Sequence, residues 1–134
     1  MDYFHPDMAV KDINKISMLG LAHVGDAVYE LLVRSYICKE GHTDVTGMHR
    51  LSISMVNANA QAAATEIILP LLDENEATVF KRGKNTKVNS VPHNSSISDY
   101  HLATALEALF GWLYLQGMTD RIECLFEAIL KGED

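Results

Sequence analysis

Two carboxylates occupy segments of the chain that are otherwise apolar. Asp26 lies in MLGLAHVGDAVYELLVRSYI, residues 18–37, and Glu107 lies in ATALEALFGWLYL, residues 103–115. Both segments have the apolar spacing that is typical of packed helices. An isolated buried charge is costly, so each acid must be exposed, paired or used in function. Small residues flank both acids, and we therefore expect the two carboxylates to converge where two helices of a bundle pack.

Two converging carboxylates suit a hard divalent cation. Mg²⁺ takes oxygen ligands, keeps several waters and needs few protein carboxylates when a substrate phosphate completes its coordination. The alternative is that each acid forms an ordinary pair on a helix surface or at an interface, for example Glu107 with a nearby lysine. The sequence has no HExxH motif, no adjacent His-Asp pair, no ExxE pair and no P-loop. Both interpretations stay open on the residues alone.

The segment around Asp26 is predicted to form one long helix over residues 18–37, although a break near Gly20 or Gly25 would be compatible with the pattern. Its core-facing stripe is expected to consist of the apolar residues at intervals of three and four: Leu21, Val24, Val28, Leu31 and Leu32. Asp26 falls off this stripe. Its side of the helix carries Ala22, His23, Tyr29, Glu30 and Val33.

The middle of the chain predicts two further helical segments. Residues 45–72 have helical spacing with an alanine-rich centre, and Pro70 is expected to end or kink this segment. Asp73 and Glu76 form a capping-box pattern, which predicts a short helix through Phe80.

The last third of the chain completes a helical fold. A helix beginning near Ser98 carries Glu107, and residues 119–131 are amphipathic. No useful stretch of β-alternation is present. The prediction is an all-α protein with about five to seven helices, folded as a single domain over residues 1–134.

A polar, basic segment separates the capping-box helix from the helix of Glu107. Residues 81–98, KRGKNTKVNSVPHNSSIS, are predicted to form a long loop, and loops of that length are usually functional or disordered. Its cations could hold phosphate oxygens and 2′-hydroxyls of a duplex, and the alternative is a solvated loop without function. No aromatic residues are interleaved, so stacking on single-stranded bases is not indicated. The expected RNA-binding residues are Lys81, Arg82, Lys84, Asn85, Lys87 and His93.

Charge and composition limit the classes of function. A net charge of -7 argues against wrapping nucleic acid with the whole surface, so such binding depends on the local basic segment. No apolar run reaches the about 20 residues needed to cross a membrane, and the amino terminus lacks a signal-peptide pattern. Cys38 and Cys124 are far apart in the sequence and are expected to be reduced core thiols. The sequence therefore predicts a cytoplasmic protein with no membrane partner.

Three of these segments together resemble a known family. VGDAVYELLVRSYI resembles the signature helix of the ribonuclease III catalytic domain, and ALEALFGWLYLQG resembles its closing motif. Between them, KRGKNTKVNSVPHNSS is similar to the small bacterial branch of that family called Mini-ribonuclease III. The resemblance covers essentially the whole chain.

The resemblance implies an all-helical homodimer that cleaves double-stranded RNA with Mg²⁺, with Mn²⁺ as an alternative ion. Cleavage would leave 5′-phosphate and 3′-hydroxyl ends and would mature the ends of large-subunit (23S) ribosomal RNA, with a ribosomal protein as a candidate facilitating partner. Asp26 matches the family's catalytic aspartate, and Glu107 matches its metal-binding glutamate. The larger enzymes carry two further acids where this chain has Ala22 and Thr104, so the four-carboxylate cluster is absent.

The sequence is compatible with three functions. The first is a double-stranded ribonuclease, the second a non-catalytic RNA-binding or ribosome-assembly module on the same fold, and the third a helical dimerisation protein with incidental carboxylates. Retention of Asp26 and Glu107 favours the first over the second. The basic segment favours either of these over the third. In a homodimer, the apolar side of the 18–37 helix, with Tyr29 and Val33 beyond it, is expected to form part of the contact.

Overall fold

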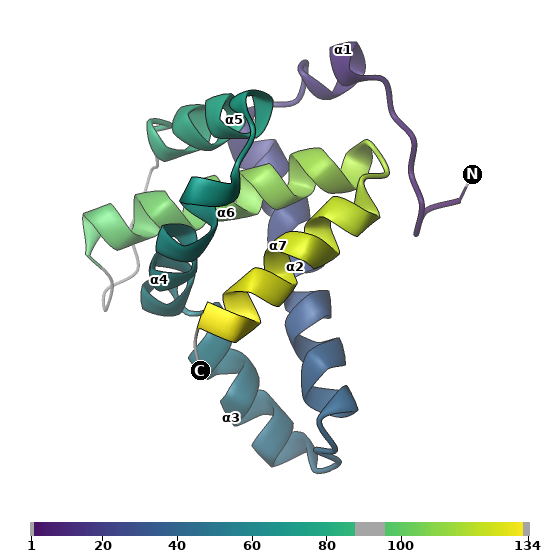
Figure 1. Cartoon of the computed structure of the whole chain (residues 1–134), viewed down its shortest axis with the longest axis vertical. Coiled ribbons are helices and arrows are strands. Elements are labelled where there is room, and N and C mark those ends of the chain that lie inside the picture. The colour runs from purple at the N-terminus through teal and green to yellow at the C-terminus, as the bar shows by residue number, and fades with distance from the viewer. Residues whose placement is uncertain (1, 88–95, 133–134) are drawn as a thin grey trace.

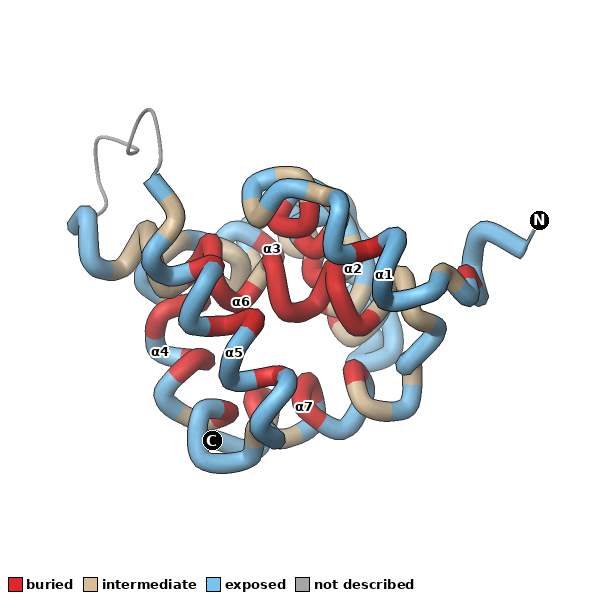
Figure 2. The backbone as a smooth tube through the Cα atoms, turned by 90° about the horizontal axis from the view of Figure 1, so that it is seen from above, coloured by how far each residue is buried: buried red, intermediate tan, exposed pale blue. Residues whose placement is uncertain are grey.

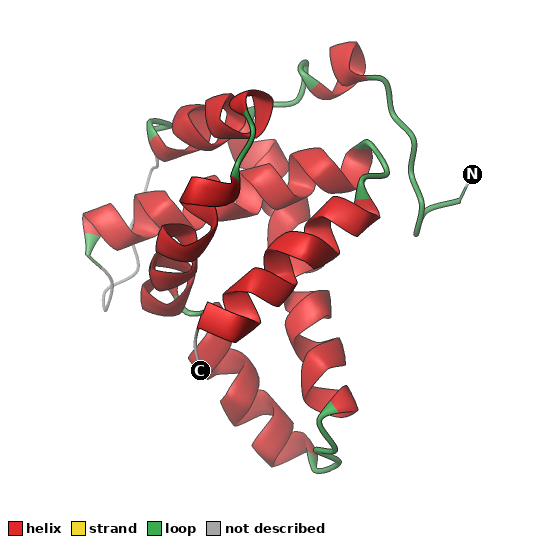
Figure 3. Cartoon of the chain, in the orientation of Figure 1, coloured by secondary structure: helices red, strands yellow, loops and turns green. Residues whose placement is uncertain are grey.

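The chain folds into packed helices, as the sequence predicts. A computed structural model describes residues 2–87 and 96–132, and these residues contain seven α-helices, one 3-10 turn and no strand (Figures 1 and 3). The helices are α1 (Val10–Ile13), α2 (Met18–Lys39), α3 (Val45–Val56), α4 (Ala58–Ile68), α5 (Glu74–Lys84), α6 (Ile97–Leu115) and α7 (Thr119–Gly132), with the turn η1 (Leu69–Leu71) after α4. The all-α prediction is confirmed.

Helix α6 forms the centre of the molecule. It packs against α2, α4, α5 and α7, and nearly every residue from position 103 to 113 is buried. Figure 2 shows the buried backbone gathered in the middle of the molecule, with exposed segments around it. A helix that is apolar on all sides is stable only when other helices surround it, and α6 meets that condition. Glu107 is therefore held on the most enclosed helix of the fold.

Helix α2 buries a different stripe from the predicted one. Its buried residues are Leu21, Ala22, Gly25, Tyr29, Val33 and Ile37. Leu31 of the predicted stripe is 56% exposed, and the helix runs without a break through Gly20 and Gly25. The helix is apolar around most of its circumference, so periodicity could not select the face that packs on α6. The small residues Ala22 and Gly25 determine which face of α2 packs on α6, because they allow close approach.

Tyr29 and Val33 belong to the interior of the subunit. The Tyr29 ring packs edge-on against Phe110 of α6 and Phe126 of α7, with ring centroids 5.4 Å and 5.9 Å apart. Val33 is fully buried in the same core. The prediction that these two residues extend a dimer contact is therefore wrong, because neither side chain reaches the surface.

The segment 45–72 is two helices rather than one. Asn57 ends α3 and begins α4 with an extended backbone, at φ -68° and ψ 162°. Its side-chain oxygen accepts a hydrogen bond from the Ala60 amide at 2.8 Å, and its side-chain amide donates to the Ile53 carbonyl oxygen at 3.0 Å. One asparagine thus caps both helix ends. Pro70 lies in η1 directly after α4, as predicted.

Helix α5 begins at the predicted capping box but continues to Lys84 instead of ending at Phe80. The prediction that residues 81–98 form one loop is therefore wrong at its start. Gly83 explains the extra turn, since a Cβ there would lie 3.0 Å from the Ala105 Cα of α6. This close packing keeps the chain helical, and basic side chains are favourable in a last helical turn.

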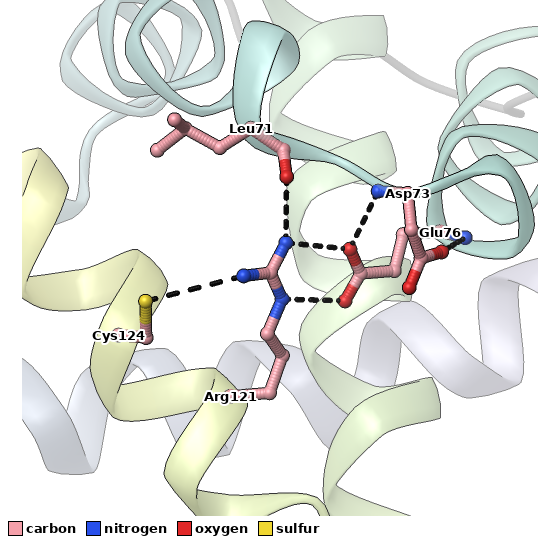
Figure 4. Close-up of polar contacts among 5 residues, drawn as sticks. All are labelled: Leu71, Asp73, Glu76, Arg121 and Cys124. Atoms are coloured by element: carbon pink, nitrogen blue, oxygen red, sulfur yellow. Dashed lines mark hydrogen bonds and ion pairs between the residues drawn. The ribbon is translucent and has the colours of Figure 1, made fainter.

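An ion pair fastens α5 to α7 (Figure 4). Both Glu76 carboxylate oxygens accept hydrogen bonds from Arg121, each at 2.8 Å, and Arg121 also donates to the Leu71 carbonyl oxygen at 2.7 Å. The Glu76 side chain is 1% exposed. The Arg121 hydrogen bonds hold the pKa of Glu76 below its usual value, against the opposing effect of burial. A paired, bidentate geometry is what allows a carboxylate to be buried here.

Two further sequence predictions are tested by the fold. Cys38 and Cys124 are free thiols, as predicted, but both are exposed rather than part of the core. Among the described residues, no helix has both the length and the apolar character needed to span a membrane.

Candidate functional site

The candidate site lies where α2 and α6 cross so closely that their backbone atoms are in contact. A Cβ built on Gly25 of α2 would overlap the Glu107 carbonyl oxygen and lie 2.8 Å from the Gly111 amide nitrogen. A Cβ built on Gly111 would in turn overlap the Leu21 carbonyl oxygen. Only glycine permits such an approach of two helices. Asp26 follows Gly25 in the chain, so this crossing brings it beside Glu107.

Asp26 and Glu107 interact directly through their carboxyl groups. Asp26 is exposed and Glu107 is half-buried. Burial, a hydrogen bond to Asp26 and the negative charge of Asp26 together raise the pKa of Glu107 to about 8. At neutral pH the raised pKa therefore favours the protonated form of Glu107 in the metal-free protein. The expected convergence of the two acids is found, and no lysine is among the groups that shift the pKa of Glu107, as the alternative interpretation would have required.

Gln61 of α4 also reaches this pair. Its side chain is buried, and its interaction with Glu107 lowers the pKa of that carboxyl against the three larger effects that raise it. Gln61 was not among the site residues predicted from the sequence. Its one signal was a long amide side chain in the alanine-rich run NANAQAAATE, where a small or apolar residue would suit helix packing better.

The two positions that carry further acids in the larger enzymes lie beside the site without adding a ligand. Ala22 is buried in the α2–α6 contact. Thr104 is also buried, and its hydroxyl donates to the Tyr100 carbonyl oxygen of its own helix at 3.0 Å. No group of three or more His, Cys, Asp or Glu residues within the described ranges could hold a metal ion. The site thus consists of two carboxylates.

Two carboxylates fit a hard divalent cation by their chemistry. Both offer oxygen ligands, and their mutual repulsion contributes to the raised pKa of Glu107. A cation between them would remove that repulsion. Mg²⁺ commonly uses one or two protein carboxylates, with water and substrate phosphate as its other ligands. The number and type of carboxylates at this site match that pattern.

The predicted RNA-binding residues that the structure describes lie in the last turn of α5 and directly after it. Lys81, Arg82 and Lys84 project from the last turn of α5 and are exposed. Asn85 and Lys87 follow the helix and are also exposed. His93 lies outside the described residues.

A polar depression joins the end of α5 to the start of α6. Its volume is about 380 Å³, and its lining residues are Lys84, Asn85, Thr86, Lys87, Ser98 and His101. His101 has a buried Nδ1 without a hydrogen-bond partner in the described part of the chain. Ser98 and His101 were not selected from the sequence, because nothing local indicates that α6 faces the basic end of α5. His101 precedes Glu107 by about 9 Å along α6.

An apolar groove runs along the outer side of α2. Its volume is about 490 Å³, and it is lined by Phe4, His23, Val24, Ala27, Val28, Leu31, Leu32, Tyr114, Thr119, Ile122 and Glu123. Four of these residues belong to the stripe of α2 that was predicted to face the core: Val24, Val28, Leu31 and Leu32. Two of its lining residues, His23 and Ala27, lie within three positions of Asp26 in the sequence of α2.

Comparison with known proteins identifies the family. The model of the Ribonuclease III domain matches residues 19–118, which include both carboxylates and most of the helices described above. The chain belongs to the ribonuclease III domain family. The resemblance inferred from the sequence motifs is thereby confirmed.

Curated relatives match this ribonuclease III domain over nearly its whole length. A Mini-ribonuclease 3 of Clostridium tetani is 40% identical over 122 residues, covering 90% of this chain and 81% of the relative. A Mini-ribonuclease 3 of Enterococcus faecalis is 35% identical, covering 91% of this chain and 94% of the relative.

A solved structure has the same fold. The crystal structure of a protein from Fusobacterium nucleatum superposes with a TM-score of 0.83 at 33% identity, covering 92% of this chain and 98% of that chain. The arrangement of helices around α6 is therefore shared with that protein.

Proposed function

We propose that this protein is a Mg²⁺-dependent endoribonuclease that cleaves double-stranded RNA. Asp26 and Glu107 would form its active site. The coarser assignment, an endoribonuclease, follows from its membership in the ribonuclease III domain family and from its Mini-ribonuclease 3 relatives. The convergence of the Asp26 and Glu107 carboxyls from two helices is the observation that supports the metal-dependent chemistry.

Asp26 and Glu107 would hold the ion through their carboxylate oxygens. When bound, a divalent ion activates a water for attack on a phosphodiester and stabilises the charge on the phosphate and the leaving 3′-oxygen, giving 5′-phosphate and 3′-hydroxyl ends. Glu107 must release its proton before it can act as a ligand, because its pKa is about 8 in the metal-free protein. Asp26 is exposed and is thus the carboxylate that incoming RNA would meet first.

The basic end of α5 would position the duplex. Lys84 and Lys87 line the depression beside α6, together with the amide of Asn85 and the hydroxyls of Thr86 and Ser98. These groups suit phosphate oxygens and ribose hydroxyls, which a protein reads without regard to sequence. A local cluster of this kind is compatible with the net charge of -7.

A homodimer would present two such sites to the two strands of one duplex. The apolar groove along α2 is the surface that we assign to the contact with a second copy. Exposed apolar side chains gather on it: Leu31 is 56% exposed and Phe4 is 74% exposed. A self-complementary apolar face is the usual basis of a two-fold dimer.

The deciding experiment compares cleavage of a duplex RNA by the parent protein, Asp26→Asn and Glu107→Gln, each with Mg²⁺ and with EDTA. We expect cleavage by the parent protein with Mg²⁺ and loss of at least about 100-fold in rate for each variant. The control is Glu66→Gln, on an exposed glutamate of α4, which should cleave at the parent rate. Equal cleavage by Asp26→Asn would remove that residue from the mechanism. Salt-sensitive RNA binding without cleavage under any condition would instead support the non-catalytic RNA-binding module.

The physiological substrate that we propose is the precursor of large-subunit (23S) ribosomal RNA. Mapping the 23S RNA ends in cells that lack the protein tests this, with extended ends as the expected result. Unchanged ends would assign the enzyme to another duplex. A facilitating ribosomal protein, Mn²⁺ as the alternative ion and a cytoplasmic location stay predictions from the sequence.

A further inference from the structure

Gln61 is a long polar side chain buried where α4 packs on α6. It is 3% exposed, and its neighbours on α4 are mostly alanines. Thr65, one turn further along, is also buried, but its hydroxyl donates to the Ala62 carbonyl oxygen at 2.6 Å. The Gln61 Nε2 atom has no partner at standard hydrogen-bond geometry among the described residues. Burying an amide in this way is costly, so its position calls for a role.

The polar group of the candidate site that Gln61 influences is the Glu107 carboxyl, on the helix that packs against α4. Gln61 interacts with Glu107 as a hydrogen-bond donor that favours the ionised carboxylate. No hydrogen bond of standard geometry occupies the Gln61 Nε2 atom in the metal-free protein. Contacts around reacting groups are often loose in the free protein and tighten when substrate or ion is bound. Three helices thus meet at one point: α2 brings Asp26, α6 brings Glu107 and α4 brings Gln61.

We propose that Gln61 is a positioning residue that holds the Glu107 carboxylate in place as a metal ligand opposite Asp26. This inference rests on the proposed function, because it takes Glu107 as a ligand. Ligating carboxylates are generally hydrogen-bonded by a second residue, and loss of that residue commonly lowers metal affinity or activity by about 10- to 100-fold.

An amide side chain suits this position better than other side chains of similar size. A glutamine side chain has both a donor and an acceptor, so it can donate to an ionised Glu107 and accept from a protonated one. A glutamate would place a third negative charge at the pair. A methionine has nearly the same shape but no amide donor, which makes Gln61→Met a suitable test of the hydrogen bond.

The experiment measures Mn²⁺ binding to the metal-free protein by electron paramagnetic resonance, and follows RNA cleavage in parallel. We expect Gln61→Met to weaken Mn²⁺ binding by about 10- to 100-fold and to lower kcat while the KM for RNA stays unchanged. Thr65→Val is the matched control, since it also converts a buried polar side chain of α4 to an apolar one. Its Mn²⁺ affinity should equal that of the parent protein.

A double-mutant cycle with Glu107→Gln separates positioning from a general structural effect. If Gln61 acts through Glu107, Gln61→Met should cause no further loss of Mn²⁺ affinity in the Glu107→Gln background. Parent-like Mn²⁺ binding by Gln61→Met, or an equal loss in both backgrounds, would overturn the inference and leave the proposed function intact. If the parent protein itself bound Mn²⁺ no better than Asp26→Asn/Glu107→Gln, the proposed function would fail first.

Discussion

Gly25 and Glu107 are in contact through their backbones: a methyl group on Gly25 would occupy the position of the Glu107 carbonyl oxygen. The residue after Gly25 is Asp26, and the side chain of Glu107 projects from the same turn of α6. The close crossing of α2 and α6 and the meeting of the two carboxylates are therefore one structural feature. A substitution that moves α2 away from α6 would therefore also move Asp26 away from Glu107.

Replacing Gly25 by alanine should destabilise the protein strongly. The added methyl group meets backbone atoms, which cannot move aside as a side chain can. We expect a loss of about 3 kcal/mol or more in the free energy of unfolding, measured with urea. Gly47→Ala is the control, since the nearest atom to a Cβ there is 3.9 Å away and alanine favours α3 by about 0.5–1 kcal/mol. Equal stability of the two variants would contradict the close crossing.

The stability of the metal-free protein should fall as pH rises from about 5 to 8. Glu107 keeps its proton in the folded state up to about pH 8, whereas in the unfolded chain it loses that proton near its ordinary pKa of 4.5. Between these pH values the unfolded state binds fewer protons, so rising pH favours unfolding. The loss is at most about 4 kcal/mol, because one pKa unit corresponds to about 1.4 kcal/mol.

Glu107→Gln should remove most of this slope and make the metal-free protein more stable at pH 8 than the parent. Thermal unfolding at pH 5 and pH 8 in EDTA measures both effects. Glu66→Gln serves as a control on an exposed glutamate of α4. A slope that persists in Glu107→Gln would mean that another group is responsible.

How much of this could be predicted from the sequence depends on whether the signal was local. The Asp73–Glu76 capping box lies within four residues, and it was predicted correctly. The buried face of α2 was not, because apolar residues on both sides gave two equivalent stripes. Only the partner helix distinguishes them, through the small residues Ala22 and Gly25.

The site shows the same limit. Asp26 and Glu107 could be paired from the sequence alone, because each lies in an apolar helix with small residues around it. Gln61 could not, since its role depends on the packing of α4 against α6. The extension of α5 to Lys84 likewise depends on a nonlocal contact, that of Gly83 with Ala105. Lys81, Arg82 and Lys84, which were predicted to lie in a loop, are therefore part of a helix.

The Glu76–Arg121 pair should be far more important for stability than an exposed pair of equal length. Arg121→Met leaves a buried carboxylate without its partner, which we expect to cost about 3–5 kcal/mol in chemical unfolding. Arg34→Met breaks the Glu30 pair, also 2.8 Å long but exposed, and should cost about 0.5 kcal/mol or less. Similar losses for both would show that burial does not matter here.

The same pair predicts a second pH dependence, in the acidic range. The pKa of Glu76 is lowered in the folded state, so its contribution is present above its unfolded pKa and is lost as pH falls through the folded pKa. Glu76→Gln/Arg121→Met should recover much of the stability lost in Arg121→Met, because no unpaired charge remains.

The apolar groove predicts how the subunits associate. Leu31→Lys places a charge on its exposed apolar wall and should convert a dimer to monomers in analytical ultracentrifugation, with little change in helix content. Ile53→Lys is the matched control, because Ile53 of α3 is similarly exposed but does not line the groove. A dimer that survives Leu31→Lys would place the contact elsewhere.

The basic end of α5 should determine how RNA binding depends on salt. Each lysine that neutralises a phosphate adds about one to the slope of log affinity against log salt concentration. Lys84→Ala/Lys87→Ala should therefore weaken duplex binding and reduce that slope by about two, measured by fluorescence anisotropy with EDTA present to prevent cleavage. Lys39→Ala, on an exposed lysine at the far end of α2, should leave the slope unchanged. If both variants keep the parent slope, the phosphate contacts lie on another surface. The depression beside His101 would then have no part in holding the duplex.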